Sequence, residues 1–363
     1  MRSRAYPLAA QSGCACAVAS VLYARRVRRL ARRVVSVTGA AMLALGLASC
    51  GSKRVETPSS LRVHGATPYV RCASTALPEA RQWQVGQLSL SIDDRTLTLT
   101  GAHAEPLVAA FTGPAPGDAS ISRALARLGG HRPAFALLLG GLGDDDATAS
   151  RTVSELATSG LLVLAVAGGR DEHGRWQTAL ASLDAPVRDR IVDVSALDRV
   201  VIGHHTFVPV AGAPGGRHAR SADACGISRA ELDARAQRLG GPRSGEQRWL
   251  ASWWAPGASG RDSVALGLDG VDVGDRLVAE LATRVGAAGG VFAYPHERAM
   301  RPATSDGSRR LGANEADRGL RITVSTLGGP TIERDDGTRV QPGIALLRLS
   351  SSGMSLESSM AAP

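Results

Sequence analysis

The chain of 363 residues lacks the short motifs that identify several large enzyme classes. The glycine-rich stretch "LGGPRSGEQ", residues 239–247, contains no lysine and is therefore not a P-loop for nucleotide phosphates. The serines in "ATSGL" and "PRSGEQ" do not stand in the G-x-S-x-G turn that an α/β-hydrolase nucleophile needs. "GHH" at Gly203 lacks the helical spacing of a zincin metal site. The sequence favours none of these chemistries.

A basic surface suited to nucleic acid is also missing. The formal net charge is +9, but residues 1–49 contain no acidic residue and eight arginines, namely Arg2, Arg4, Arg25, Arg26, Arg28, Arg29, Arg32 and Arg33. Subtracting these charges leaves 9 − 8 = +1 for the rest of the chain. Because phosphate-backbone binding needs clustered positive charge, we expect no nucleic-acid partner.

The arginine-rich segment leads into an apolar run. "RRVRRLARR" precedes Val34 to Ala48, which at 15 residues is shorter than the roughly 20 that a bilayer-spanning helix requires. The run ends in "LASC", and Leu47-Ala48-Ser49-Cys50 resembles the lipobox of bacterial lipoproteins. The resemblance implies a signal peptide over residues 1–49 and a lipid-modified Cys50 at the start of the mature chain. An ordinary signal peptide or a short anchor is the alternative.

Residues 50–84 begin with a polar segment that contains proline and serine, which predicts a tether between the lipid and the folded part. The expected location is the bacterial cell envelope. Gly51 stands where some bacteria use aspartate to retain lipoproteins in the inner membrane, which favours the outer membrane. Only Cys72 and Cys225 remain in the mature part, and they either form a disulfide in this oxidising compartment or stay as two buried thiols.

Residues 85–363 show the pattern of one α/β domain. "QLSLSIDDRTLTLTG" alternates apolar and polar residues on both sides of Asp93-Asp94, which predicts a β-hairpin over 87–101. Buried strands are then predicted near 107–111, 134–141 and 161–169, with helices over 118–130 and 147–160 between them. This alternation predicts a mainly parallel sheet with its chemistry at the carboxyl ends of the strands. Further strands are expected in "RIVDV", "RVVIG", "TFVPVAGA", "RWLASWWAP", "GGVFAYPHE", "LRITVS", "IALLRLS" and "MSLES", and helices in "ISRAELDARAQRL" and "DRLVAELATRVG".

The segments at those strand ends read "FTGPAP", "GGLGD", "GGRD", "SWWAP" and "AYPH". Their order resembles the calcineurin-like metallophosphoesterases, whose signature runs D-x-H, G-D-x-x-D, G-N-H-D/E, a histidine before prolines, and G-H-x-H. The resemblance covers Pro106 to Leu349 and implies an α/β/β/α sandwich. In the family, two metal ions at the strand ends bind the phosphate, and a metal-bound hydroxide attacks it.

The resemblance also implies that this chain has lost nearly every metal ligand. Gly113 stands for the first aspartate and Ala115 for its histidine, while Gly141 replaces the bridging aspartate. Glycine and alanine offer no ligand atom, and tryptophan offers only an N–H donor. The positions that form the degenerate site are Gly113, Gly141, Asp144, Gly169, Arg170, Asp171, Trp253, Tyr294 and His296, of which Asp144, Asp171 and His296 alone keep a ligand type.

The resulting hypothesis is a non-catalytic domain that holds no metal or other cofactor and serves in binding or scaffolding. Its expected partners are the membrane, through the lipid, and an unknown envelope protein or a small anion held by Arg170 and glycine amides. The alternative is an active metal-dependent phosphoesterase with a relocated site. Such a site would draw on Asp144, Asp145, Asp146, Asp171, Glu172, His173, His204, His205 and His296. Acidic runs that precede helices are more typical of helix N-termini.

Overall fold

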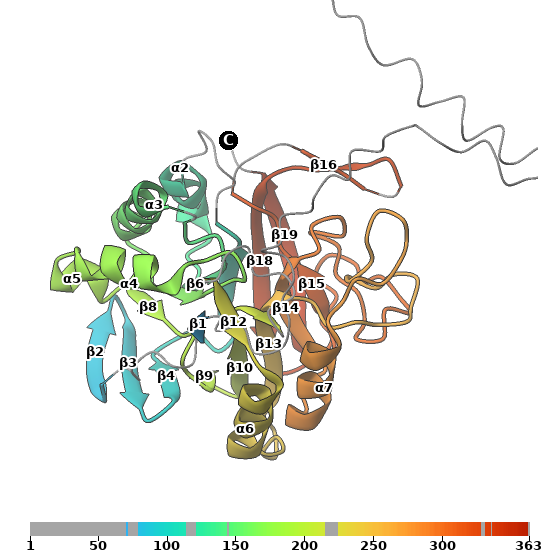
Figure 1. Ribbon diagram of the computed structural model, residues 1–363, viewed down its shortest axis with the longest axis horizontal. Coiled ribbons are helices and arrows are strands. Elements are labelled where there is room, and N and C mark those ends of the chain that lie inside the picture. Colours follow the sequence, from blue (N-terminus) through green and yellow to red (C-terminus); the bar gives the residue numbers. More distant parts are fainter. Residues whose placement is uncertain are drawn as a thin grey trace, which may run out of the picture. The chain divides into compact units, whose positions relative to one another are not determined.

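The computed structural model describes residues 70–71, 79–113, 121–143, 145–214, 224–327, 331–334 and 336–361 (Figure 1). Residues 62–363 form one compact unit. The signal peptide, Cys50, Cys72, Ala115 and Asp144 lie outside the described residues. None of the described helices has the length and apolar character needed to cross a membrane.

An eight-stranded mixed sheet has the order β15-β14-β13-β10-β9-β4-β3-β2. Strands β10, β13, β14 and β15 run parallel to one another, whereas β2, β3 and β4 form an antiparallel meander. The bounds are β2 Arg81–Val85, β3 Leu88–Asp93, β4 Thr96–Thr100, β9 Arg199–Ile202, β10 His205–Val210, β13 Gln247–Trp254, β14 Gly289–Tyr294 and β15 Arg321–Thr323. The hairpin expected over 87–101 is confirmed. Strand β2 was not expected, and it extends the sheet before residue 85, where we had placed the domain boundary.

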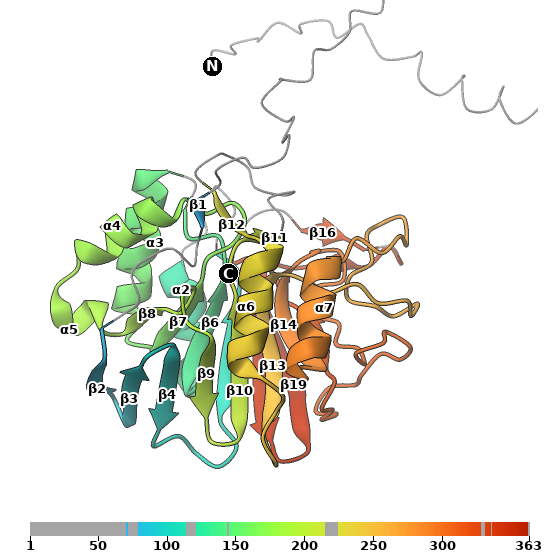
Figure 2. The same cartoon turned by 60° about the horizontal axis from the view of Figure 1, so that its bottom comes forward.

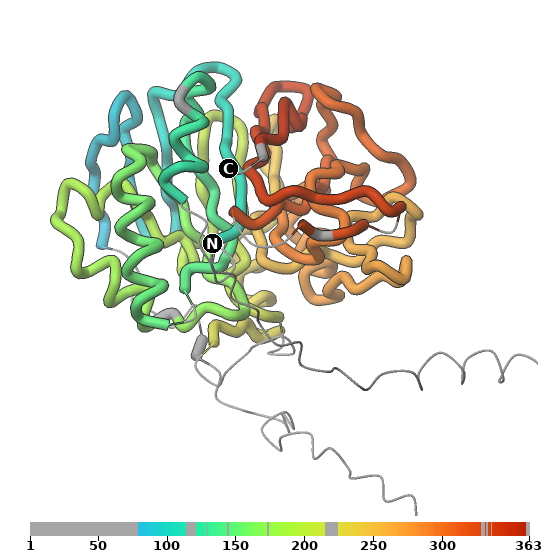
Figure 3. The backbone as a smooth tube through the Cα atoms, turned by 90° about the horizontal axis from the view of Figure 1, so that it is seen from above, coloured from blue at the N-terminus to red at the C-terminus, as the bar shows by residue number. Residues whose placement is uncertain are grey.

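A six-stranded sheet has the order β19-β18-β5-β6-β7-β8. Its bounds are β5 Leu107–Phe111, β6 Phe135–Leu139, β7 Val163–Val166, β8 Ile191–Asp193, β18 Gly343–Ser350 and β19 Gly353–Ala361. Strands β5 to β8 are parallel, as the β-α-β alternation predicted. The C-terminal strand β18 pairs antiparallel with β5, so the red and teal segments lie side by side in Figure 3. Every residue of β6 and β7 is buried, which explains their unbroken apolar sequences.

The two sheets face each other, and helices cover their outer faces. The ring of Phe135 on β6 meets the ring of Phe207 on β10 edge-on, with 6.0 Å between centroids. Helices α2 (Ile121–Ala126), α3 (Asp146–Thr158), α4 (His173–Ala181) and α5 (Ala185–Arg188) lie beside the six-stranded sheet (Figure 1). Helices α6 (Arg229–Leu239) and α7 (Arg276–Val285) cover β10, β13 and β14 (Figure 2) and share a second buried cluster with them. The fold is therefore α/β, with helix, sheet, sheet and helix in succession. Helices α4 and α5 were not predicted.

A small parallel sheet, β1 (Val70–Arg71), β12 (Cys225–Ile227) and β11 (Ala213–Pro214), was also not expected. It is attached to the loop after β7, because the Cys225 backbone N–H donates to the Asp171 carbonyl at 3.0 Å. Cys225 is disulfide-bonded, and Cys72, the partner that the sequence suggests, lies outside the described residues. A second small sheet pairs β16 (Ile332–Glu333) with β17 (Arg339–Val340).

Candidate functional site

The carboxyl ends of the strands bring most of the predicted site residues together. We call this region the mouth and define it by Gly113, Gly141, Gly169, Arg170, Asp171, Trp253, Tyr294 and His296. Strands β5, β6 and β7 supply the glycine loops and Asp171, while β13 and β14 of the facing sheet supply Trp253 and Tyr294. Asp144, the ninth predicted residue, lies outside the part of the chain that the structure describes.

The loops that follow β5 and β6 touch through their backbones. The Gly113 N–H donates to the Gly140 carbonyl at 2.9 Å. A Cβ atom built on Gly113 would lie 1.8 Å from the Gly141 carbonyl oxygen, and one built on Gly141, where φ is +72°, would lie 2.8 Å from Gly113 Cα. No side chain fits at either position unless the loops move apart. The two glycines therefore let the loops touch, and no ligand side chain fits at either position in this arrangement.

Trp253 packs on the loops that follow β6 and β7. Its side chain is only 6% exposed. Cβ atoms built on Gly140 and Gly168 would lie 2.2 and 2.5 Å from Cε3 of its ring, so the indole rests directly on both glycines. The next residue, Trp254, packs on Tyr294 with ring centroids 4.2 Å apart. Trp253, which the resemblance matched to a histidine before prolines, is thus a packed aromatic ring.

Asp171 keeps its carboxylate but uses it to join two loops. The side chain is fully buried, and Oδ1 accepts from the Leu142 backbone N–H at 2.8 Å while Oδ2 accepts from the Gly168 N–H at 2.6 Å. These bonds tie the loop after β6 to the loop after β7. The same bonds occupy the backbone N–H groups of Leu142 and Gly168. The N–H of Gly113 is occupied too, because it donates to the Gly140 carbonyl. The amides that we expected to hold an anion are therefore already bonded at these three positions.

His296 is a neutral histidine at physiological pH. Its pKa is lowered to about 4, mainly by burial and also by the positive charge of Arg170, although a hydrogen bond to the Val324 carbonyl acts in the opposite direction. Its Nδ1 atom is buried and has no hydrogen-bond partner among the described residues. The Tyr294 ring stands edge-on to the imidazole, with 5.7 Å between centroids.

The acidic residues after β6 and β7 belong to helix ends. Asp145 caps α3, accepting from the Thr148 N–H at 2.8 Å, and this hydrogen bond is the main reason why its pKa is lowered. Glu172 pairs with Arg175 at 2.6 Å. The interpretation of these runs as helix N-termini is confirmed for Asp145.

The histidines of the proposed relocated metal site do not converge. His205 begins β10 opposite Gln247, whereas His296 follows the far end of β14, beyond the Trp254–Tyr294 pair. The length of β13 separates the two ends by roughly 20 Å. Within the described parts of the chain, no group of three or more histidine, cysteine, aspartate or glutamate side chains could hold a metal ion. The set that combined His204 and His205 with His296 was therefore wrong.

A cavity lies at the opposite edge of the eight-stranded sheet, where β10 and β13 begin. We call it the arginine cleft. Its volume is about 720 Å³, and it is lined by Thr96, Thr98, Arg199, Val201, Gly203, His204, Thr206, Arg243, Ser244, Gly245, Glu246, Gln247, Arg318 and Ser351. Sequence analysis missed it because five separate segments contribute. The stretch "PRSGEQ", which is neither a P-loop nor a nucleophile turn, forms one wall.

Comparison with known proteins gives little beyond the fold class. No family model and no curated protein match the chain. One solved structure, 9% identical, covers 70% of this chain and 100% of its own with a TM-score of 0.47. The crystal structure of TT1561 of Thermus thermophilus, 10% identical, covers 68% of this chain and 99% of its own with a TM-score of 0.45. Similarities of this size carry no argument about function.

Proposed function

We propose that the chain is a bacterial envelope lipoprotein whose α/β domain is a catalytically degenerate relative of the calcineurin-like phosphoesterases and serves in binding or scaffolding. The four-layer arrangement and the meeting of the expected loops at the strand ends support this assignment. The observation that carries it is the state of Asp171, whose two oxygens both bind backbone amides next to the packed Trp253 ring.

Hydrolysis by the family's route needs two metal ions held by several carboxylate and imidazole ligands. Among the described mouth residues only Asp171 and His296 have such groups, and Asp171 already accepts two hydrogen bonds. The Arg170 guanidinium adds a permanent positive charge close enough to lower the pKa of His296, and the same charge would repel a dication. The donor set therefore favours a mouth that holds no metal.

The test measures metal and activity on the same sample. Full-length protein purified in detergent should contain no stoichiometric zinc, manganese or iron and should not hydrolyse p-nitrophenyl phosphate. Asp171→Asn separates the two roles of this residue. If Asp171 joins loops, the variant loses stability, because one buried N–H loses its acceptor, and metal content does not change. Two metal equivalents that fall together with activity in Asp171→Asn would contradict the proposal.

One observation favours the alternative of an active phosphoesterase with a rearranged site. The buried Nδ1 of His296 has no partner in the described part of the chain, and such atoms in native proteins usually have one. Metal-dependent hydrolysis that disappears in His296→Gln, while Asp171→Asn remains active, would support this alternative.

The lipid anchor has its own test. Cells that express the chain should incorporate labelled palmitate into it, and the protein should fractionate with the membrane. Cys50→Ser should abolish both, because only a thiol accepts the diacylglyceryl group. Unchanged labelling in Cys50→Ser would exclude this lipidation site.

A further inference from the structure

The arginine cleft lies between a bare part of the eight-stranded sheet and the loop that leads from α6 into β13. Thr96 and Thr98 of β4 and Arg199 and Val201 of β9 form the sheet wall. They alternate along their strands with the buried residues Leu97, Leu99, Val200 and Ile202, so they face away from the core. Arg243 to Gln247 form the opposite wall, and Arg318 and Ser351 complete the lining.

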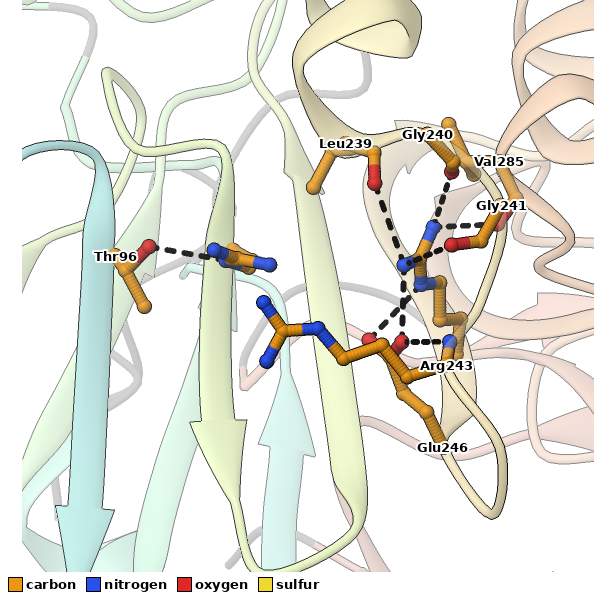
Figure 4. A network of polar contacts seen from close by, with 9 residues as sticks. Thr96, Leu239, Gly240, Gly241, Arg243, Glu246 and Val285 are labelled. Carbon is orange, nitrogen blue, oxygen red and sulfur yellow. Dashed lines mark hydrogen bonds and ion pairs between the residues drawn. The ribbon is translucent and has the colours of Figure 1, made fainter.

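Arg248, which is only 4% exposed, holds the loop of residues 243–247 in place. Its guanidinium donates to the carbonyls of Leu239, Gly240 and Gly241 at the end of α6 and to Val285 at the end of α7, at 2.6 to 3.4 Å. It also binds both carboxylate oxygens of Glu246 at 2.9 Å (Figure 4). A buried cation therefore holds two helix ends and the loop in one arrangement.

Glu246 is the single acidic side chain among the described lining residues, and it is already neutralised. Burial would raise its pKa, but hydrogen bonds from the Arg248 guanidinium, the Arg243 backbone N–H and the Thr206 hydroxyl lower it to about 2. The negative charge of the Glu246 carboxylate is thus neutralised by the positive charge of Arg248. The charge of Glu246 does not offset the other arginines of the cleft.

Three further arginines surround the cleft with excess positive charge. Arg243 and Arg318 are exposed, and no described residue forms an ion pair or a side-chain hydrogen bond with either. Figure 4 shows the Arg243 side chain extending from its loop, away from Glu246, toward the strand of Thr96. Arg199 donates through Nε to the Thr96 hydroxyl at 3.0 Å, which leaves its two terminal nitrogens for other contacts.

We propose that the arginine cleft binds a small phosphorylated polyol or sugar. Guanidinium groups bind phosphate oxygens in pairs, and three of them around one cavity focus positive potential there. Thr96, Thr98, Ser244 and Ser351 supply hydroxyls that can donate to and accept from the hydroxyls of a polyol. The described lining contains no phenylalanine, tyrosine or tryptophan, and His204 is its one aromatic ring, so it offers little surface on which a nucleotide base would stack. A cavity of about 720 Å³ is also larger than a single phosphate needs.

This site does not depend on the degeneracy of the mouth. It lies at the amino ends of β10 and β13, whereas the mouth lies at their carboxyl ends. Phosphoesterase activity at the mouth would leave the cleft proposal unchanged, and a cleft that binds nothing would leave the mouth proposal unchanged.

The experiment is calorimetric titration of the full-length protein in detergent at low ionic strength. Glucose 6-phosphate should bind at one site, inorganic phosphate should bind more weakly, and glucose should not bind. Arg243→Gln and Arg318→Gln should each weaken glucose 6-phosphate binding about tenfold, because each removes a charge-assisted hydrogen bond. Arg151→Gln is the matched control, since Arg151 is an exposed arginine on α3, and it should bind like the unchanged protein. Equal unfolding midpoints will show that all variants fold.

Several results would overturn the proposal. They are no binding of glucose 6-phosphate, equal binding of glucose or of inorganic phosphate, and equal weakening in Arg151→Gln, which would indicate only a response to net charge. A second titration identifies the source of the phosphate group. Tighter binding of glycerol 3-phosphate indicates a free monoester, whereas tighter binding of glycerophosphoglycerol indicates a diester within a polymer. Binding of neither would count against a phosphorylated polyol.

Discussion

The two edges of the eight-stranded sheet differ in how their polar groups are used. At the mouth, the carboxylate of Asp171 and the nearby loop amides bond to one another, and Trp253 fills the remaining space. At the arginine cleft, the buried pair of Glu246 and Arg248 is satisfied, but the side chains of Arg243 and Arg318 have no partner among the described residues. Ligands of open α/β sheets usually bind at the carboxyl ends of the strands. In this molecule the exposed unused binding groups lie at the opposite edge, while the mouth keeps a buried unpaired atom, Nδ1 of His296.

The largest expected effect comes from opening the mouth. Trp253→Ala should lower the free energy of unfolding by about 3–5 kcal/mol, because it removes a buried ring and leaves a cavity over two glycines that cannot fill it. Trp83→Ala is the control, since Trp83 lies half-buried on the edge strand β2 and its loss should be smaller. Urea denaturation measures both. Equal losses would show that Trp253 is not a packed element of the mouth, and the contrast between the edges would weaken.

The scaffold of the cleft should be nearly as sensitive. Arg248→Gln should destabilise the protein by about 3 kcal/mol, because it leaves the Glu246 carboxylate without its buried cation and several helix-end carbonyls without a donor. Arg276→Gln is the matched control, because Arg276 pairs with Glu280 on an exposed helix face, where ion pairs contribute little. Similar unfolding curves for the two variants would show that Arg248 does not fix the loop.

Acid should weaken the cleft edge through His205. The pKa of His205 is lowered to about 4, mainly by burial and also by the neighbouring His204. In the unfolded chain, His205 has its ordinary pKa of about 6.5 and is protonated before the folded form is. The contribution of neutral His205 to folding stability is therefore present at pH 7 and is lost as the pH falls toward 4. The loss attributable to His205 at pH 5 is about 2 kcal/mol. His205→Phe should reduce the difference between urea midpoints at pH 7 and pH 5, and an unchanged difference would assign it to other groups.

The smallest effect on stability should come from Arg243, whose side chain lines the arginine cleft. Arg243→Gln should change the free energy of unfolding by no more than about 0.5 kcal/mol, because the side chain is exposed and no described residue binds it. A loss of about 2 kcal/mol or more in urea denaturation would show that Arg243 is structural, and the cleft would then resemble the mouth.

Much of the fold could be predicted from local patterns. Strands β5, β6 and β7 are short apolar runs that end at glycines, and α6 begins with a capping box in which Ser228 and Glu231 bond reciprocally. The missed elements have weak local signals. Helix α4 has a short, mixed sequence, and β1 is a pair of residues that becomes a strand only because β12 lies beside it.

The candidate sites divide in the same way. The mouth residues were named from the phosphoesterase resemblance, and the rule that parallel strands end at one edge accounts only for those that share a sheet. That rule says nothing of distance, and the contact of Trp253 with Gly140 and Gly168 depends on how the two sheets face each other. The arginine cleft could not be predicted, because Thr96, Arg199, Arg243 and Arg318 are far apart in sequence and meet only in the folded sheet.

The pairing of β1 with β12 determines where the segment before residue 70 joins the folded unit. Strand β12 is bonded to the Asp171 loop, so a chain held at Cys50 would be attached on the mouth side. The arginine cleft lies at the amino ends of β10 and β13, so the length of the sheet separates it from this junction.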